Sequence, residues 1–171
     1  MPAHLPVQLP SQLPSQLPSQ LAEFNSGVLR YDWDDPRVAD FAEALDQVNA
    51  IAARSPGFVW RLPDEDMEAA QLDPDGVLGG NPRTASTLSV WRDVESLERF
   101  VWQTLHRRFF DRREEWFAPG QGIRLVLWYV REDHRPTIEE AVERFRHLRS
   151  HGDTDFAFGW ERAKQLSALA N

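Results

Sequence analysis

The chain contains no cysteine, and Lys164 is the single lysine among its 19 basic residues. The lack of cysteine excludes disulfides, thiolate zinc sites, iron–sulfur clusters and cysteine nucleophiles. No stretch approaches the roughly 18 consecutive apolar residues of a membrane span, so we expect no membrane partner. Acidic residues number 27, and the resulting net charge of −8 argues against a general nucleic-acid-binding protein. Because targeting signals are also absent, we expect a cytoplasmic location.

The first twenty residues differ in composition from the rest of the chain. The unit Gln-Leu-Pro-Ser occurs three times between residues 8 and 19. Proline at every fourth position removes backbone donors and disfavours both helices and central strands. Residues 1–20 are therefore predicted to be a disordered or polyproline-like tail, followed by a single domain over residues 21–171. The tail is either a docking arm for a partner or dispensable, and its composition favours the second interpretation.

Hydrophobic periodicity in the remaining residues predicts the order β-α-β-β-α-β, followed by a further helix. Strands are expected over residues 21–31, 58–62, 84–91 and 123–130, and helices over 35–54, 93–117 and 136–150, the second being either one kinked helix or two. Residues 63–83 contain several glycines and prolines, so we expect a long acidic loop there. This order predicts an α+β fold of the ferredoxin-like type, with an antiparallel four-stranded sheet.

The fourth predicted strand is apolar on both of its faces. Leu125, Leu127 and Tyr129 alternate with Val126, Trp128 and Val130 along residues 123–130. A sheet covered on one side only would alternate apolar and polar residues. If the predicted helices cover one face, the other face needs a second sheet, and an identical subunit supplies it most economically. The sequence therefore predicts a homodimer.

Several short motifs carry a resemblance to a known superfamily. They are Asp35-Pro36-Arg37, the segment 55–61 (SPGFVWR), Ser89-Val90-Trp91, His106, the segment 113–117 (REEWF), Leu127-Trp128, and His134 before Pro136-Thr137. With them, the chain resembles the dimeric α/β-barrel superfamily, and within it a bacterial family of unknown function related to antibiotic biosynthesis monooxygenase-like proteins. The resemblance implies a two-fold dimer with a cavity in each barrel. It also implies relatives that include cofactor-free oxygenases, cyclases and haem-degrading enzymes.

His106 is the titratable residue that the sequence singles out. It lies among aromatic residues of the second predicted helix, and apolar surroundings disfavour a charged imidazole. A neutral His106 is therefore a candidate general base, or an axial ligand if haem binds. Its alternative role is that of a core histidine hydrogen-bonded to a backbone carbonyl.

A second group of residues has the composition of a binding site for a flat aromatic molecule. Such sites are mostly apolar with a few polar contacts. The predicted ligand-binding residues are Asn25, Trp60, Ser89, Trp91, Trp102, Phe110 and Trp128. Strand alternation places Asn25, Ser89 and Trp91 together on the sheet face away from the helices, while the faces of Trp60 and Trp128 stay open. The alternative is a packed interior.

Two charged patterns have simpler explanations. The segment 99–113 contains five arginines and one acidic residue, and it either binds an anion, attracts the acidic loop as a lid, or is a solvated helix face. Glu143, His147 and His151 have the spacing of metal ligands on a helix. However, His151 adjoins Gly152 at the expected helix end and no fourth ligand is evident, so we predict no metal site.

Three functions are compatible with these residues. The first is a cofactor-independent monooxygenase or cyclase acting on an aromatic or polycyclic substrate, with His106 as base and Asn25 or Trp91 as donors to an oxyanion. The second is a non-catalytic protein that binds a hydrophobic small molecule. The third is a haem protein with His106 as ligand. We expect no cofactor for the first two, and the sequence names neither reaction nor substrate.

Overall fold

The computed structural model describes residues 19–104, 106–120 and 124–169. Four strands form one antiparallel sheet in the order β2-β3-β1-β4. The strands are β1 (Ser19–Val28), β2 (Phe58–Arg61), β3 (Thr84–Trp91) and β4 (Arg124–Arg131). In this order β3 separates β1 from β2, which is the arrangement of a split β-α-β unit. The α+β fold with a four-stranded antiparallel sheet is therefore confirmed.

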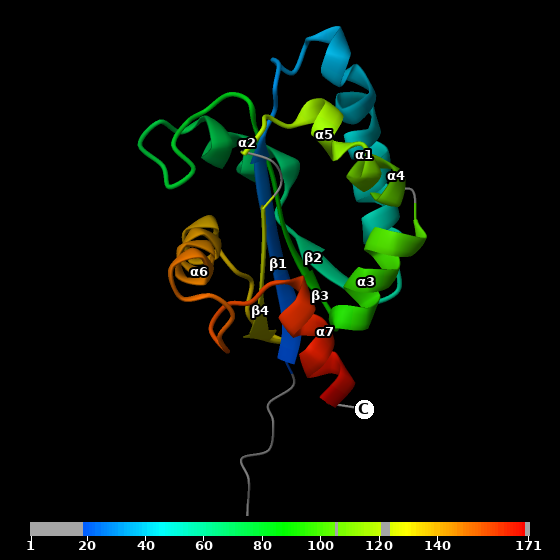
Figure 1. Cartoon of the computed structure of the whole chain (residues 1–171), viewed down its shortest axis with the longest axis vertical. Coiled ribbons are helices and arrows are strands. Elements are labelled where there is room, and N and C mark those ends of the chain that lie inside the picture. The colour runs from blue at the N-terminus through cyan, green and yellow to red at the C-terminus, as the bar shows by residue number, and fades with distance from the viewer. Residues whose placement is uncertain (1–18, 105, 121–123, 170–171) are drawn as a thin grey trace, which may run out of the picture.

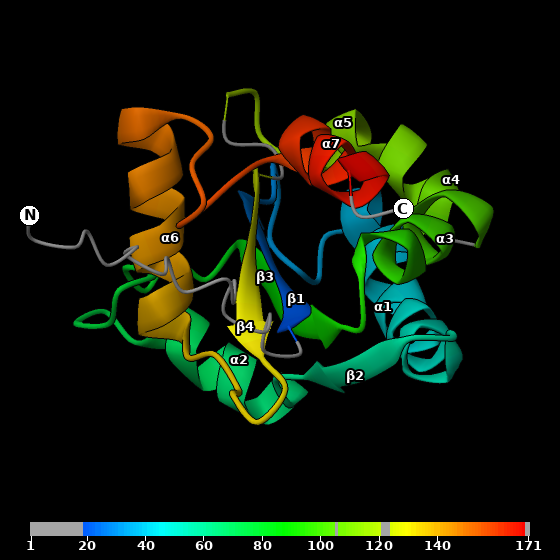
Figure 2. The ribbon, with the colours of Figure 1, turned by 90° about the horizontal axis from the view of Figure 1, so that it is seen from below.

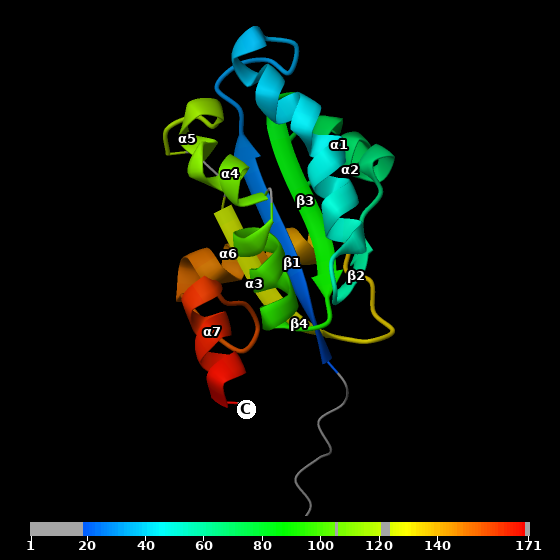
Figure 3. The ribbon, with the colours of Figure 1, turned by 90° about the vertical axis from the view of Figure 1, so that its right-hand side faces the viewer.

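Helices lie on both sides of the sheet. They are η1 (Pro36–Val38), α1 (Ala39–Arg54), α2 (Asp64–Leu72), α3 (Val94–Gln103), α4 (His106–Asp111), α5 (Arg113–Trp116), α6 (Ile138–His151) and α7 (Trp160–Leu169). Figure 1 shows α1, α3 and α4 to the right of the sheet and α2 and α6 to its left. Viewed from below, the sheet stands between these two groups (Figure 2). Figure 3 shows α1, α3, α4, α5 and α7 in front of the sheet.

The alternation expected along β4 is confirmed, but the premise that helices of the same chain cover only one face of the sheet is wrong. Val126, Trp128 and Val130 lie in one buried cluster with residues of α2 and α6. Leu127 lies in a second cluster, with residues of α1, α3 and α7. Helices of the same chain thus cover both faces, and Trp128 has no exposed surface. The sheet needs no second subunit for its burial, so the expected homodimer stays a prediction without this support.

Residues 63–83 were expected to form a loop throughout, and this is wrong for their first half. Helix α2 begins directly after Pro63. Its first turn carries Asp64, Glu65 and Asp66, and negative charges at a helix N-terminus are favourable because of the helix dipole. Met67 is buried against the sheet and anchors the helix. The acidic residues of α2 therefore lie on the opposite side of the sheet from α3, α4 and α5. They do not form a lid over the arginines of residues 99–113.

The segment 93–117 forms three short helices instead of one or two. Helix α3 ends at Thr104, whose backbone is extended. The Thr104 hydroxyl donates to the Phe100 carbonyl and accepts from the His106 amide at 3.2 Å, so it replaces helical backbone bonds at the break. Serine and threonine side chains commonly compete with helical bonds in this way. Helix α4 buries none of its side chains completely.

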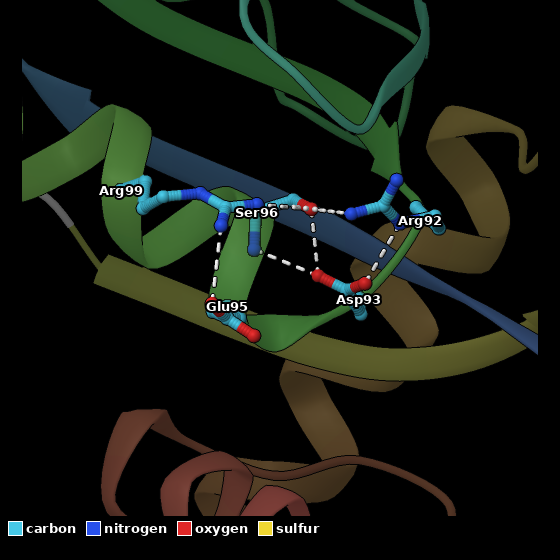
Figure 4. Close-up of polar contacts among 5 residues, drawn as sticks. All are labelled: Arg92, Asp93, Glu95, Ser96 and Arg99. Atoms are coloured by element: carbon cyan, nitrogen blue, oxygen red, sulfur yellow. Dashed lines mark hydrogen bonds and ion pairs between the residues drawn. The ribbon is translucent and has the colours of Figure 1, made fainter.

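The connection from β3 to α3 is held by a polar network (Figure 4). Asp93 caps α3, because its carboxylate accepts from the Ser96 amide at 2.7 Å and from the Ser96 hydroxyl at 2.6 Å. Arg92 pairs with Asp93, and Arg99 pairs with Glu95. The buried Ser96 is therefore fixed at the point where the chain enters the helix.

The chain ends of the domain are attached to the sheet. Phe158 forms two backbone hydrogen bonds with Leu127, which cover part of the β4 edge before α7 begins. Strand β1 starts at Ser19, where Ser19 and Gln20 pair with Arg131 and Val130. These two residues were expected in the tail and instead belong to the sheet, while residues 1–18 lie outside the described residues. In the described ranges no helix is long and apolar enough to cross a membrane.

Candidate functional site

A row of polar side chains crosses one face of the central strands. Glu23 lies opposite Ser89, and Asn25 lies opposite Thr87, in the β1–β3 register. We refer to these four residues as the polar belt. Residues two apart on a strand share a face, so the belt lies on the same face as Leu21 and Trp91. Glu23 and Ser89 are buried, whereas Asn25 and Thr87 keep part of their surface in contact with solvent.

The polar belt separates two apolar clusters on this face. On one side Leu21 and Trp91 pack with α1, α3 and α7. On the other side Leu29 packs with Trp116 and Phe117. Helix α4 reaches from one cluster to the other, because its first residue contacts a ring of the former cluster and its Phe109 packs in the latter. The interior therefore changes from apolar to polar and back along β1 and β3, with α4 linking the two apolar parts.

Glu23 accepts hydrogen bonds on both of its carboxyl oxygens. The Ser89 hydroxyl donates to Oε2 at 2.7 Å, and the Asn25 amide donates to Oε1. The Trp91 indole donates to the Ser89 hydroxyl at 2.9 Å. Because an indole N–H can only donate, the Ser89 oxygen accepts from Trp91. Its own proton is donated to Glu23 when that carboxyl is ionised, and its second lone pair can accept from Glu23 when the carboxyl is protonated.

The environment of Glu23 favours its protonated form. Burial raises the pKa of Glu23 to about 7 from an ordinary value of 4.5, and the bonds from Ser89 and Asn25 only partly oppose this rise. Among the ion pairs of the described residues, none involves Glu23. Strongly perturbed carboxyls of this kind are concentrated at functional sites, because structural carboxylates are usually paired with a cation.

His106 lies at the end of the ring stack that begins at Trp91. The Trp91 and Phe100 ring centroids are 5.1 Å apart, and those of Phe100 and His106 are 5.0 Å apart. Burial lowers the pKa of His106, and a hydrogen bond to the Val101 backbone opposes part of this effect. The Nδ1 atom is buried and has no hydrogen-bond partner in the part of the chain that the structure describes. His106 is therefore a neutral imidazole with one unsatisfied nitrogen.

A model of one protein family, a domain of unknown function (DUF3291), matches residues 20–170 of the chain. The chain belongs to this family. The match covers both halves of the sheet, the polar belt and His106. No match to the DUF3291 chain is found among curated proteins.

Solved structures with a similar fold show how far the likeness extends. A protein of unknown function from Nitrosomonas europaea, NE2512, is 11% identical with a TM-score of 0.45, covering 70% of this chain and 97% of that one. SnoaB from Streptomyces nogalater, a cofactor-independent oxygenase, is 16% identical with a TM-score of 0.43, covering 70% of this chain and 97% of that one. Similarity at this level carries no activity over to the DUF3291 chain.

The structure divides the predicted ligand-binding residues between the two faces of the sheet. Asn25, Ser89 and Trp91 come together as expected, but their face is covered by α1 and α3, so the expectation of a helix-free face is wrong. Trp60 and Trp128 belong to the opposite cluster with α2 and α6. Their registers explain this, because Trp60 lies opposite Val90 and Trp128 opposite Ala22, one residue out of phase with the belt. The Trp128 indole instead donates to Glu140 at 2.9 Å.

Trp102 and Phe110 contact each other outside the polar belt. Their rings meet edge to face at 5.1 Å. Trp102 also lines an open surface hollow of about 460 Å³ between α3 and α7, whose lining residues are Glu95, Glu98, Arg99, Trp102, Gln103 and Lys164. Two ion pairs, Arg99–Glu95 and Lys164–Glu98, already satisfy the charges of this hollow. Neither His106 nor Phe110 is part of the lining of this hollow.

The charged patterns of the sequence are engaged in local contacts. Arg112 pairs with Glu115 and Asp40, and Arg107 pairs with Asp111. Within residues 19–104, 106–120 and 124–169, no three His, Asp or Glu side chains are arranged to hold a metal ion. His147 and His151 stack at 4.3 Å, and His147 contacts the Thr154 hydroxyl. These contacts fasten the loop after α6 to the helix.

Glu23 is the residue that the sequence analysis missed. It lies two positions before Asn25 on the same strand face, between the buried Leu21 and Asn25. An acidic residue at an inward position of a strand that is otherwise apolar is a usable signal, because carboxylates are almost never fully buried without a partner. Alternation along residues 21–29 places Glu23 on the same face as Leu21 and Asn25, and this pattern can be seen in the sequence alone.

Proposed function

We propose that the DUF3291 chain is a cofactor-independent enzyme that moves a proton on a small aromatic or polycyclic molecule at the polar belt, in a reaction of the monooxygenase or cyclase type. The observation that carries this proposal is the buried Glu23 carboxyl, which accepts two neutral hydrogen bonds and has no cation beside it in the described residues. Such a group lowers the stability of the fold at neutral pH, so a role in chemistry is its best explanation.

The two perturbed groups fit complementary roles. A neutral imidazole with a free nitrogen is a general base, which is the role of His106 Nδ1. A carboxyl that stays protonated near neutral pH can donate a hydrogen bond to the oxygen on which negative charge develops, which is the role of Glu23. Asn25 and Trp91, the donors expected from the sequence, are engaged with Glu23 and Ser89 and therefore position the acid.

The runner-up functions have less support from the geometry. A protein that only binds a ligand has no need for a buried carboxyl. An uncharged amide supplies similar hydrogen bonds without the cost of burying a charge. For haem, the described residues fit poorly, because the His106 Nδ1 atom is buried and the ring packs against Phe100. An absorption spectrum of the purified protein tests haem directly, since a Soret band requires it.

The test is turnover of hydroxylated polycyclic aromatics in air without added cofactor, followed by mass spectrometry for gain of oxygen or loss of water. His106→Ala is expected to reduce turnover by about 100-fold or more, the usual range for a lost general base. Glu23→Gln is expected to retain some activity but to lose the decline that the wild type shows as the pH rises through about 7. This decline follows because only the protonated carboxyl donates.

Two matched variants serve as controls, Glu68→Gln on α2 and His151→Ala on α6, both at exposed positions. They carry the same chemical changes and are expected to keep wild-type turnover and its pH profile. If the wild type and every variant bind the aromatic compounds but turn none of them over, the chain is a binding protein instead of an enzyme. An unchanged alkaline limb in Glu23→Gln would remove Glu23 from the mechanism.

A further inference from the structure

The surface hollow between α3 and α7 is formed by one face of α3 and by one lysine of α7. Figure 3 shows the two helices next to each other. Four lining residues are spaced three or four positions apart and therefore share one face of α3, namely Glu95, Glu98, Arg99 and Trp102. Lys164, the single lysine of the chain, lines the hollow from α7. The volume of about 460 Å³ lies within the range of about 300–1,000 Å³ that is usual for small-molecule sites.

The two ion pairs of the hollow differ in how closely their partners approach. Arg99 donates a hydrogen bond to Glu95 at 3.1 Å. Lys164 and Glu98 are 3.9 Å apart, which is longer than a hydrogen bond, and their side chains are 42% and 41% exposed. An exposed ion pair of this kind contributes little to stability. The hollow therefore presents an ammonium group and a carboxylate side by side, and a ligand can bond to both without breaking a strong contact.

An aromatic surface adjoins this ion pair. Trp102 lies one helical turn after Glu98, and residues with this spacing have Cβ atoms about 5–6 Å apart. The Trp102 ring meets Phe110 at 5.1 Å and Trp160 at 6.5 Å, each edge to face. The Lys164 Nζ atom is in turn 5.9 Å from the centroid of the Trp160 ring. The Trp102 ring and the Lys164 ammonium group are therefore both positioned by packing before any ligand binds.

The charges of the lining disfavour ligands of a single sign. The hollow contains two carboxylates, from Glu95 and Glu98, and two cations, from Arg99 and Lys164. An anion bound at Lys164 also approaches the Glu98 carboxylate, and a cation bound at Glu98 also approaches the Lys164 ammonium group, because these two groups are 3.9 Å apart. A molecule with adjacent positive and negative groups can lie antiparallel to this pair. Each of its charges then meets an opposite charge.

From the loose ion pair and the adjoining ring we infer that this hollow binds the zwitterion of a free α-amino acid with an aromatic side chain. The ammonium group of the ligand lies beside Glu98, its carboxylate beside Lys164, and its ring against Trp102. The spacing of Glu98 and Trp102 on α3 is close to the distance between the charged groups and the ring of such an amino acid. The site is separate from the polar belt, so the inference does not depend on the proposed function.

Four small molecules test the inference with the full-length wild-type protein, in NMR titrations that follow the ligand signals at pH 7. The complete probe is L-phenylalanine. Its partial forms are 2-phenylethylamine, which lacks the carboxylate, 3-phenylpropanoate, which lacks the ammonium group, and L-alanine, which lacks the ring. L-Phenylalanine is expected to bind about three- to tenfold more tightly than each partial form, since one net hydrogen bond or ring contact contributes about this factor.

Variants then assign each charge of the ligand to its residue. Lys164→Met is expected to weaken L-phenylalanine and 3-phenylpropanoate by about three- to tenfold and to spare 2-phenylethylamine. Glu98→Gln is expected to show the reverse pattern, weakening L-phenylalanine and the amine and sparing 3-phenylpropanoate. The matched controls are Arg162→Met and Glu161→Gln on α7, which lie outside the lining and should leave all affinities unchanged. Circular dichroism checks that each variant is folded, and the comparison of the four molecules on the wild type stands without the variants.

Three results would overturn the inference. The first is binding of 2-phenylethylamine or 3-phenylpropanoate as tight as that of L-phenylalanine, which would mean that one charge of the hollow carries the recognition. The second is equal binding of L-alanine, which would remove the Trp102 ring from the site. The third is the absence of measurable binding of L-phenylalanine to the wild type. None of these results bears on turnover at the polar belt, so the proposed function stands or fails separately.

Discussion

At the scale of single residues, the polar belt sets function against stability. Glu23 is 5% exposed and has no described cation to offset the desolvation of its charge. Ser89 and Asn25 supply hydrogen bonds, but burial dominates and the pKa rises to about 7. A neutral isostere at this position would make the fold more stable at most pH values. Retaining a carboxyl there is typical of a residue whose chemistry is needed.

This balance predicts how stability depends on pH. The unfolded carboxyl titrates near 4.5 and the folded one near 7, so between these values the folded state binds the additional proton. The free energy of unfolding contributed by Glu23 is therefore full below pH 4.5 and is lost as the pH rises to about 7. Glu23→Gln removes this loss. At pH 8 the variant is expected to be more stable than the wild type by about 3 kcal/mol, at about 1.4 kcal/mol for each pKa unit.

Urea denaturation of the wild type and Glu23→Gln at pH 4, 6 and 8 measures this difference. The gap between them should widen with pH, and subtracting the two curves removes the titration of every other group. Glu68→Gln, at an exposed position of α2, should show no widening. If Glu23→Gln is less stable than the wild type at pH 8, the carboxylate has a favourable partner, and its proposed role as an acid loses its basis.

Strand alternation alone predicts which residues of the site share a sheet face, and it predicts nothing further about them. Asn25, Ser89 and Trp91 share a face because their positions have the same parity in paired strands. Trp60 and Trp128 could not be placed, because that requires the register between strands, and the sequence of one strand does not contain it. His106 was found from its aromatic neighbours, whereas its unpaired Nδ1 depends on the break at Thr104.

At the scale of elements, the approach of β2 to α3 depends on one glycine. Gly57 has a φ of +86°, and a Cβ atom there would lie 2.0 Å from the Ser96 Oγ atom. Its carbonyl also accepts from the Arg92 amide at 2.7 Å. The network around Ser96 therefore packs directly against the backbone that enters β2. This contact positions α3, which in turn supplies Phe100 to the ring stack beneath His106.

Gly57→Ala is expected to destabilise the protein by more than Gly152→Ala. Both residues have positive φ values, and such sparsely populated backbone conformations cost a non-glycine residue about 1–3 kcal/mol. At Gly152 the added Cβ meets nothing within 4 Å, so only this cost applies. At Gly57 the clash with Ser96 adds about 1–3 kcal/mol of overpacking. Thermal denaturation of the two variants measures the difference, and equal losses would show that α3 shifts without cost.

The elements themselves were largely predictable, with exceptions of a common kind. Proline or an N-cap residue marks the starts of η1, α3 and α6, and hydrophobic alternation marks all four strands. Helix α2 was missed because only Met67 is fully buried in it, so its apolar periodicity is weak. The three-way division of 93–117 was also missed, because side-chain bonds at Thr104 interrupt a continuous apolar pattern.

At the scale of the whole molecule, the double covering of the sheet changes how a dimer would form. The sequence correctly indicated that both faces of β4 are buried. It could not show that α2 and α6 fold back over the second face. A homodimer would therefore use surfaces other than the two sheet faces, such as the outer surfaces of α2 and α7, where Leu72 and Leu169 are exposed. Sedimentation of the wild type decides between a mass near 19.7 kDa and twice that value.

The boundary of the folded domain can be located by two deletions at the N-terminus. Removal of residues 1–18 leaves all pairs of β1 in place and is expected to keep the melting midpoint within a few degrees. Removal of residues 1–22 also eliminates the buried Leu21 and Ala22 and their pairing with Trp91 and Trp128. Losing a buried leucine and strand hydrogen bonds costs about 3 kcal/mol or more. At about 2–4 °C per kcal/mol, the longer deletion should lower the midpoint by about 6–12 °C. Similar losses in both would mean that residues 1–18 pack on the domain.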